Sequence, residues 1–373
     1  MDKRKNFFVT LVLTFALAAF SLSDAAAAHA SRIITGHDGD KVTIPDKIDR
    51  IAVLSILPFP SVIASYLGSA HKIVGIHPAS MGAAKSGLLG ELFPEILKAK
   101  TSFIKGQDLN IEELMLLKPD IVFYNMGDDA MAQMLHSAKI PAIAVSATKW
   151  NYDILLTYEE WTKLLARIFP EKSDKSRKVS DYSKKIYSMI RQRTSKLKDN
   201  ERKKIFFVFM NDRRKIVTSG KLFFGQYWAD AIGAYNSAEN LAAENLNAVV
   251  TMEQIYAWNP DVIFITNFTT VLPGDLIGNK IQGQDWTKVK AVKNKAVYKM
   301  PLGSYRTFTP GVDTPITLLW FAKMTYPKLF KDVDIYKETR DYYKKVLGIT
   351  LTDKQIRGIF NGTRDSANGY TIQ

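Results

Sequence analysis

Cysteine is absent from all 373 residues, and its absence excludes disulfide bridges, iron–sulfur clusters and thiolate metal sites. A protein of this length needs no disulfides, because a large domain buries enough apolar surface to fold by itself. A lipid anchor attached through an N-terminal cysteine is excluded as well. We therefore expect a protein that is not lipid-anchored and that is stabilised by its hydrophobic core.

Three common catalytic signatures are also missing: the phosphate loop G-x-x-x-x-G-K-[ST], the zinc-protease H-E-x-x-H and the nucleophile elbow G-x-S-x-G. Histidine is scarce, and beyond residue 30 it occurs only as His37, His71, His77 and His136, all in the first half. A metal ion held between two halves of a protein would need ligands from each. We therefore expect neither a catalytic centre nor a bare metal site. An enzyme stays as the alternative class of protein.

Long hydrophobic runs are confined to the first thirty residues. A basic start at Lys3–Lys5 precedes an apolar stretch from Phe7 to Leu22, and Ala28-His29-Ala30 fits a cleavage site. This pattern predicts a secretory signal peptide over residues 1–30, with an N-terminal membrane anchor as the alternative. Export, together with the missing lipid-anchor cysteine, indicates a free protein in a Gram-negative periplasm.

Positive charge is in excess, with 51 Lys and Arg against 37 Asp and Glu and a formal net charge of +14. Much of the excess lies between Lys163 and Lys204, where apolar residues also recur at helical spacing. The lysines there are therefore expected to form the solvated face of a helix, and no nucleic-acid partner is predicted. Net basicity favours an anionic ligand or an anionic membrane surface.

One pattern occurs twice in the chain. A glutamate precedes a Pro-Asp pair by seven residues in both copies, Glu112 to Asp120 and Glu253 to Asp261, and each ends in an apolar run. The second copy is displaced by 141 residues (112 to 253 and 119 to 260). Proline ends a helix, and the β-rich run after it suits a central parallel strand. The repeat therefore predicts two similar lobes with a cleft between them.

The rest of the chain fits an α/β fold in which two Rossmann-like lobes are joined by a single long helix. We expect the N-terminal lobe over residues 31–170, the interlobe helix over 171–200 and the C-terminal lobe over 201–373. The unbroken part of the helix is expected from about Ser173 to Lys198. The polar tail after Gly358 is expected to be loosely ordered. The expected strands are Val42–Ile44, Ile51–Ser55, Ile73–Ile76, Ile121–Tyr124, Ala142–Val145, Ile205–Phe209, Ile216–Thr218, Val262–Thr266 and Val297–Lys299.

Several fragments in this order resemble the class III solute-binding proteins of ABC importers, which carry ferric siderophores, haem and cobalamin. The fragments are Val42–Pro45, Arg50–Val53, Gly106–Glu112, Leu117–Asp120, Trp228–Asn236 with Gly233, Glu253–Asp261, Pro301–Arg306 and Pro315–Lys323. The match covers roughly 300 residues and is specific to the superfamily rather than to a ligand.

The resemblance implies a monomeric periplasmic protein that delivers its ligand to an ABC permease dimer in the inner membrane. By motif position, Glu112 and Glu253 are the expected permease-docking residues. The alternative is that both are ordinary first-turn helix glutamates favoured by the macrodipole. The expected ligand is a small-molecule metal chelate, a ferric siderophore first, with haem, cobalamin or a nickel or cobalt chelate as alternatives. No resident cofactor is expected.

Ligand-binding side chains are expected beyond the carboxyl ends of the parallel strands. Tyr305 and Arg306 are the first choice, because a phenol can ligate iron and a guanidinium can pair with a carboxylate or catecholate. The alternative for this pair is an exposed loop, and for the aromatic candidates it is plain packing. The remaining candidates are Arg213, Arg214, Trp150, Phe268 and His77.

Overall fold

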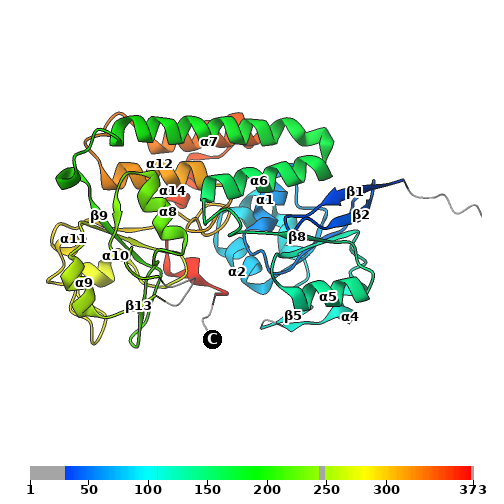
Figure 1. Ribbon diagram of the computed structural model, residues 1–373, viewed down its shortest axis with the longest axis horizontal. Helices are drawn as coiled ribbons and strands as arrows, with labels where there is room; N and C mark the ends of the chain where they lie inside the picture. Colours follow the sequence, from blue (N-terminus) through cyan, green and yellow to red (C-terminus); the bar gives the residue numbers. More distant parts are fainter. Residues whose placement is uncertain (1–29, 107, 243–247, 371–373) are drawn as a thin grey trace, which may run out of the picture.

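Two α/β lobes lie side by side beneath one long helix (Figure 1). The computed structural model describes residues 30–106, 108–242 and 248–370. The expected signal peptide, apart from Ala30, lies outside the described residues. Within the described part, none of the helices combines the length and the apolar character needed to span a bilayer.

Each lobe is built on a four-stranded parallel sheet, and the two sheets have the same strand order. In both, the second strand along the chain lies at one edge, followed by the first, third and fourth. This shared topology confirms the duplication inferred from the repeated pattern. The N-lobe sheet is β4 (Ile73–Ile76), β3 (Ile51–Val53), β7 (Ile121–Asn125) and β8 (Ala142–Val145), and the C-lobe sheet is β12 (Tyr235–Asn236), β9 (Lys204–Val208), β14 (Val262–Ile265) and β15 (Val297–Lys299).

The strands are apolar on both faces because both faces are covered. In the N-lobe, Ile51 and Phe123 enter a core that is continuous across both lobes, whereas Ala52 and Val122 enter a separate outer cluster. The C-lobe has an outer cluster of its own. Lobe helices are α1 (Phe59–Leu67), α2 (Pro78–Ser86), α3 (Leu88–Leu92), α4 (Ile111–Leu116), α5 (Asp129–Ser137), α8 (Phe224–Ala231), α9 (Met252–Trp258), α10 (Pro273–Ile277) and α11 (Lys290–Lys293), with 3-10 turns η1 (Pro94–Lys98) and η3 (Asp199–Glu201).

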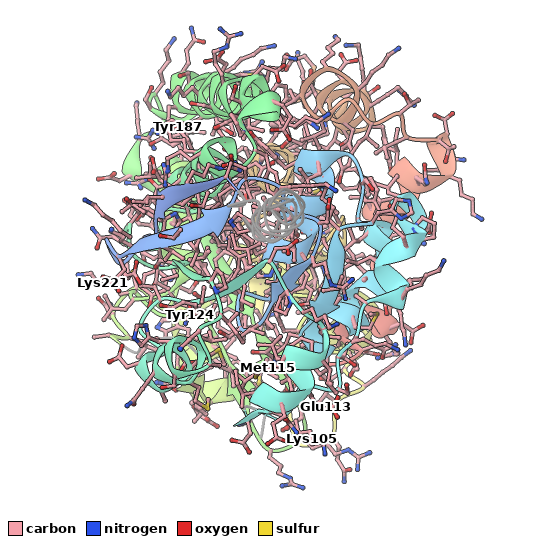
Figure 2. The ribbon with its side chains drawn as sticks, turned by 90° about the vertical axis from the view of Figure 1, so that its right-hand side faces the viewer. Lys105, Glu113, Met115, Tyr124, Tyr187 and Lys221 are labelled. Carbon is pink, nitrogen blue, oxygen red and sulfur yellow. The ribbon has the colours of Figure 1, made fainter. Side chains whose placement is uncertain are left out.

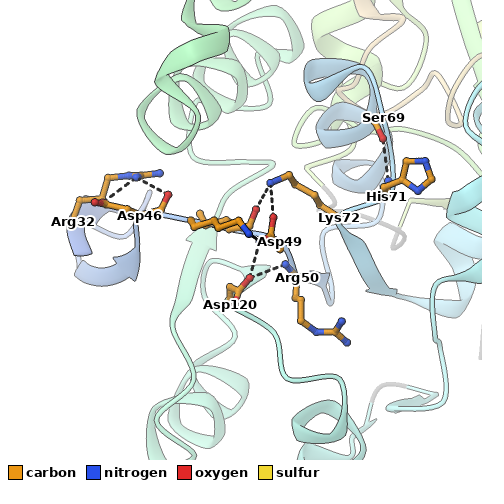
Figure 3. A network of polar contacts seen from close by, with 10 residues as sticks. Arg32, Asp46, Asp49, Arg50, Ser69, His71, Lys72 and Asp120 are labelled. Atoms are coloured by element: carbon orange, nitrogen blue, oxygen red, sulfur yellow. Dashed lines mark hydrogen bonds and ion pairs between the residues drawn. The ribbon is translucent and has the colours of Figure 1, made fainter. Parts of the chain in front are cut away.

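The repeated Pro-Asp pair has the same structural role in each lobe. The Asp120 carboxylate accepts the backbone N–H groups of Asp49 at 2.7 Å and Arg50 at 2.8 Å, just before β3 begins (Figure 3). The Asp261 carboxylate accepts the N–H of Lys204 at 2.9 Å, the first residue of β9. In each lobe the aspartate that follows the helix therefore fixes the start of the neighbouring central strand.

Small antiparallel elements border the two sheets, and most of them are too short to show a sequence pattern. The hairpin formed by β1 (Ser31–Thr35) and β2 (Lys41–Pro45) bonds to the edge strand β8, where the His37 N–H donates to the Ala144 carbonyl. The others are the hairpin of β5 (Ile104–Lys105) with β6 (Asp108–Leu109), and the three-stranded sheet of β10 (Met210–Asn211), β11 (Ile216–Val217) and β13 (Val249–Val250).

The long helix is α7 (Ser173–Thr194), which ends four residues before the expected Lys198. At 1.5 Å per residue it is about 33 Å long. Val179, Ile186 and Ile190 on one stripe are buried, and most of its lysines are exposed, as the amphipathic pattern predicts. Lys175 is an exception, because its ammonium donates to the Ser65 carbonyl at 3.0 Å.

A group of further helical elements packs around α7. It comprises α6 (Ile154–Ile168), η2 (Pro170–Lys172), α12 (Thr314–Thr325), α13 (Ile335–Tyr342), the π-helical turn η5 (Tyr343–Leu347) and α14 (Asp353–Ile359). The expectation of a loosely ordered tail after Gly358 is wrong. The chain continues into η6 (Arg364–Ala367), where Ser366 is fully buried, and this segment lies between the lobes (Figure 1).

Candidate ligand-binding site

A pocket of about 660 Å³ opens at the carboxyl ends of β9 and β14 in the C-lobe. These are the first and third strands of the sheet, so the pocket lies at the point where the strand order reverses, the usual place for a ligand in such folds. The lining residues are Met210, Asn211, Asp212, Arg214, Lys215, Phe268, Thr269, Thr270 and the C-terminal residues Ala367–Tyr370.

Arg306 is held beside this pocket by a tightly fixed loop that follows β15. The buried Asp313 carboxylate accepts both the backbone N–H and the hydroxyl of Ser304 at 2.8 Å. Gly303 is required there because a Cβ atom would lie 2.2 Å from the Asp313 carboxylate. Burial raises the pKa of the Asp313 carboxyl. The loop therefore presents Tyr305 and Arg306 from a rigid base.

Arg306 is 1% exposed, and among the described residues its hydrogen-bond acceptors are all neutral. Nε donates to the carbonyls of Asn267 at 3.1 Å and Ser366 at 3.0 Å. Nη1 donates to the Ala79 carbonyl at 3.3 Å, and Nη2 to the Asn368 carbonyl at 2.6 Å. The remaining bond runs from Nη1 to the Tyr305 hydroxyl at 3.3 Å. Among the described residues, no carboxylate forms an ion pair with Arg306.

Three aromatic rings surround the same guanidinium. Its central carbon lies 5.4 Å from the ring centroids of Phe268 and Tyr305, and 5.7 Å from that of Tyr370. Phe268 is in turn stacked on Phe209 at 5.0 Å. Burial raises the pKa of the Tyr305 phenol, so its hydroxyl stays protonated near neutral pH. The arrangement gives a fixed positive charge with flat apolar walls.

The N-lobe reaches Arg306 through the first turn of α2. His77 is the N-cap of that helix, and its Nδ1 accepts the Ala79 N–H at 3.0 Å. Burial lowers the pKa of His77 to about 4, which keeps the imidazole neutral. The Ala79 carbonyl is the Arg306 acceptor described above. His77 therefore shapes the N-lobe wall near the arginine.

The other sequence candidates lie further from this cluster. Arg214 borders the pocket, whereas Arg213 is exposed and is not part of the lining. Trp150 packs edge-on against His37, with ring centroids 4.9 Å apart, beside the edge strand β8. The structure thus brings Tyr305, Arg306 and Phe268 together, and a ligand-binding role for each candidate stays a prediction.

Sequence reasoning missed the contribution of the C-terminal residues. The carbonyls of Ser366 and Asn368 hold Arg306, and the Tyr370 ring lies edge-on to Phe268 at 4.6 Å. A backbone carbonyl has no residue signature, so only the isolated aromatic Tyr370 in a polar tail could have drawn attention to this segment.

The two repeated glutamates lie on helices α4 and α9, and both helices lie on the side of the molecule away from α7 (Figure 1). Glu112 and Glu253 are both exposed, and each is the second residue of a capped helix, α4 or α9. Its own backbone N–H and the Thr251 hydroxyl lower the pKa of Glu253. Glu113, beside Glu112, is half-buried and accepts the Ser102 hydroxyl at 3.2 Å.

Apolar side chains are exposed on the same helix as Glu112. Leu116 is 74% exposed and Met115 is 50% exposed. Figure 2 shows Met115 and Glu113 at the lower end of the N-lobe, far from Tyr187 on α7. Across the residues that the structure describes, no cluster of three His, Asp or Glu side chains could hold a metal ion.

Two duplicated lobes, a connecting helix and a pocket at the strand ends define a bilobal solute-binding protein. The profile of the periplasmic binding protein family matches residues 53–302, and the chain belongs to that family. Within the family it is a class III periplasmic binding protein of ABC importers, as the resemblance predicted. Members of this family are solute-binding transporter components that reside in the periplasm and work with a permease.

Three similarities cover nearly the whole chain. The molybdate-binding protein MolA of Haemophilus influenzae is 28% identical over 355 residues, which cover 90% of this chain and 95% of MolA. A solute-binding protein from Veillonella parvula superposes with a TM-score of 0.79 at 28% identity, over 89% of this chain and 97% of that one. The structure of MolA bound to molybdate superposes with a TM-score of 0.70 at 25% identity, over 86% of this chain and 99% of MolA.

Proposed function

We propose that this protein captures a negatively charged metal species through Arg306 and delivers it to an ABC permease dimer in the inner membrane. The supporting observation is the buried guanidinium whose acceptors are all neutral. Arginine cannot lose its proton in a protein, and an uncompensated buried charge is costly. A binding protein keeps such a charge where its ligand supplies the opposite one.

Molybdate is the first candidate ligand. The whole-length similarity to MolA supports it, and a tetrahedral dianion matches a site built around one fixed cation. The ferric siderophore expected from the sequence is the second candidate, favoured by the aromatic walls of Phe268, Tyr305 and Tyr370. Haem, cobalamin and a nickel or cobalt chelate stay as alternatives. We propose no enzymatic activity.

Calorimetric titration of the purified protein with molybdate, tungstate, sulfate and ferric siderophores tests this proposal. We expect Arg306→Gln to weaken binding of the true ligand by about 30-fold to 1,000-fold, the cost of removing one partner of a buried charged contact. Arg177→Gln, at an exposed arginine on α7, is the matched control and should bind like the wild type. Equal affinity of Arg306→Gln and wild type for every ligand bound would refute the assignment.

We also propose that Glu112 and Glu253 dock the two lobes onto the permease. Both glutamates are exposed, and each is the second residue of a helix, α4 or α9, that lies on the side of its lobe away from α7. Two acidic points at a fixed spacing can engage basic pockets on both subunits of a two-fold transporter. The exposed Leu116, one turn after Glu112, would add apolar contact at the same tip.

The remaining proposals concern organisation. We propose lobes over residues 31–170 and 201–373 joined by the helix of residues 171–200, with residues 1–30 as a cleaved signal peptide. The mature protein is proposed to be a monomer without a lipid anchor and without a nucleic-acid partner. The amphipathic character of α7 supports the absence of a nucleic-acid partner, because its exposed lysines are the solvated face of a helix whose other face is buried.

A further inference from the structure

The C-terminal segment Thr363–Tyr370, named the strap below, begins on the C-lobe. The Arg364 guanidinium forms a two-point ion pair with the buried Asp275 carboxylate, at 2.7 and 2.8 Å, and also donates to the Thr270 carbonyl at 2.9 Å. From this anchor the strap runs through η6 into the space between the lobes, as the red segment of Figure 1 shows.

The strap accepts hydrogen bonds from two of the three guanidinium nitrogens of Arg306, the proposed ligand anchor. The Ser366 carbonyl accepts from Arg306 Nε, and the Asn368 carbonyl accepts from Nη2. Tyr370 covers Phe268 edge-on and lies over the guanidinium. Residues 367–370 also form one wall of the pocket. The strap therefore makes, with neutral groups, the contacts that an anion would make with Arg306.

The strap also touches the N-lobe, at a glycine. A Cβ atom on Gly82 of α2 would lie 2.5 Å from the Asn368 carbonyl oxygen and 2.9 Å from the Cα of Gly369. Gly369 itself has a φ of +77°, a conformation that other residues rarely adopt. The close backbone packing shows that the strap has a defined seat against both lobes.

We propose that the strap is an internal competitor of the ligand, which must displace it from Arg306 in order to bind. This inference rests on the proposed anion-binding role of Arg306. A carbonyl oxygen is a weaker partner for a guanidinium than an anionic oxygen, so a charged ligand can replace it. A strap seated in about nine molecules out of ten raises the apparent Kd about ten-fold, because only the open fraction binds.

Gly82→Ala in the full-length chain tests the competition. The new methyl group collides with the seated strap and leaves Arg306 intact, and alanine is a better helix former than glycine. We expect molybdate to bind about ten-fold more tightly than to the wild type. Gly358→Ala is the matched control, because that helical glycine has open space around its Cβ position. Tyr370→Ala, which removes the ring from Phe268, should shift the Kd in the same direction.

Displacement can be followed directly, since the chain has no cysteine of its own. Ser366→Cys places a thiol at a fully buried position of the strap, and Ser183→Cys places one on α7, where the serine is 3% exposed. We expect saturating molybdate to speed the reaction of the strap thiol with Ellman's reagent several-fold and to leave the α7 thiol unchanged.

The outcomes separate this inference from the proposed function. Binding by the wild type with equal or weaker binding by Gly82→Ala would refute the strap as a competitor and leave anion capture intact. Binding by Gly82→Ala alone would support the competition strongly. If no variant binds molybdate, tungstate, sulfate or a ferric siderophore, anion capture and strap competition both fail. An unchanged rate for the strap thiol at saturating ligand would refute displacement.

Discussion

The repeated aspartates offer a quantitative test of the duplicated design. Asp120→Ala removes the acceptor of two backbone N–H groups that precede β3, and Asp261→Ala removes the acceptor of one N–H and the partner of Lys290 at 2.7 Å. Bonds to an ionised carboxylate contribute roughly 1.5–3 kcal/mol when protected and less when exposed. Both aspartates are half-buried, so we expect each change to cost about 2 kcal/mol.

The assay is the thermal midpoint measured by calorimetry. An unfolding entropy of about 2.1 cal/mol/K per residue over 373 residues converts 2 kcal/mol into a Tm lowered by roughly 3 °C. Because Asp120 and Asp261 lie in separate lobes, the Tm of the double variant should fall by about twice as much. The unfolding should still be a single transition, since the main core is continuous across both lobes. Asp181→Ala, exposed on α7, is the matched control. A lower Tm for only one of the two single variants would contradict the equivalent roles of Asp120 and Asp261.

The remaining predictions concern transport, pH and the buried lysine at the end of β15. Glu112→Gln with Glu253→Gln should abolish uptake in cells while the Kd of the purified protein stays unchanged, and normal uptake would refute docking. Burial lowers the pKa of His37 to about 4, so the stability that the neutral imidazole contributes is fully present above pH 6.5 and is lost as the pH falls through 4. In His37→Asn the free energy of unfolding, measured in urea, should change by about 3 kcal/mol less between pH 6.5 and pH 4 than in the wild type. His136→Asn, at an exposed histidine, is the control. Lys299→Met leaves three buried carbonyls without their donor and should cost about 2–4 kcal/mol, measured as a lower Tm.

The sheets could be predicted from sequence because their strands are buried on both faces and the Pro-Asp pair marks where two of them begin. Strand β12 was not predicted, because a strand of two residues is too short to show an alternating sequence pattern. The end of α7 was placed four residues too late. The sequence after Thr194 still contains residues that favour helices, and local propensity does not show where packing ends a helix.

The strand-end rule names residues that follow the strands of each sheet, but it does not tell which of those strands lie in the middle of the sheet and which lie at its edge. Phe268 follows β14, next to the point where the strand order reverses, and it lies in the pocket wall. Trp150 follows β8, the edge strand of its sheet, and packs on His37. Arg213 lies in the turn between β10 and β11 and faces solvent. Strand order is a tertiary property, so one sequence could not separate these cases.

The contacts of Asp313 sharpen the interpretation of Arg306. A buried arginine with a purely structural role would be expected to pair with a carboxylate, and Asp313 is buried at the base of the same loop. Its oxygens instead accept hydrogen bonds from Ser304 and Tyr343. Within the described residues the guanidinium charge therefore has no carboxylate partner and is covered by carbonyls, which the proposed anionic ligand would replace. An aspartate paired with Arg306 would stabilise the empty protein and would neutralise the charge that we propose attracts the anionic ligand.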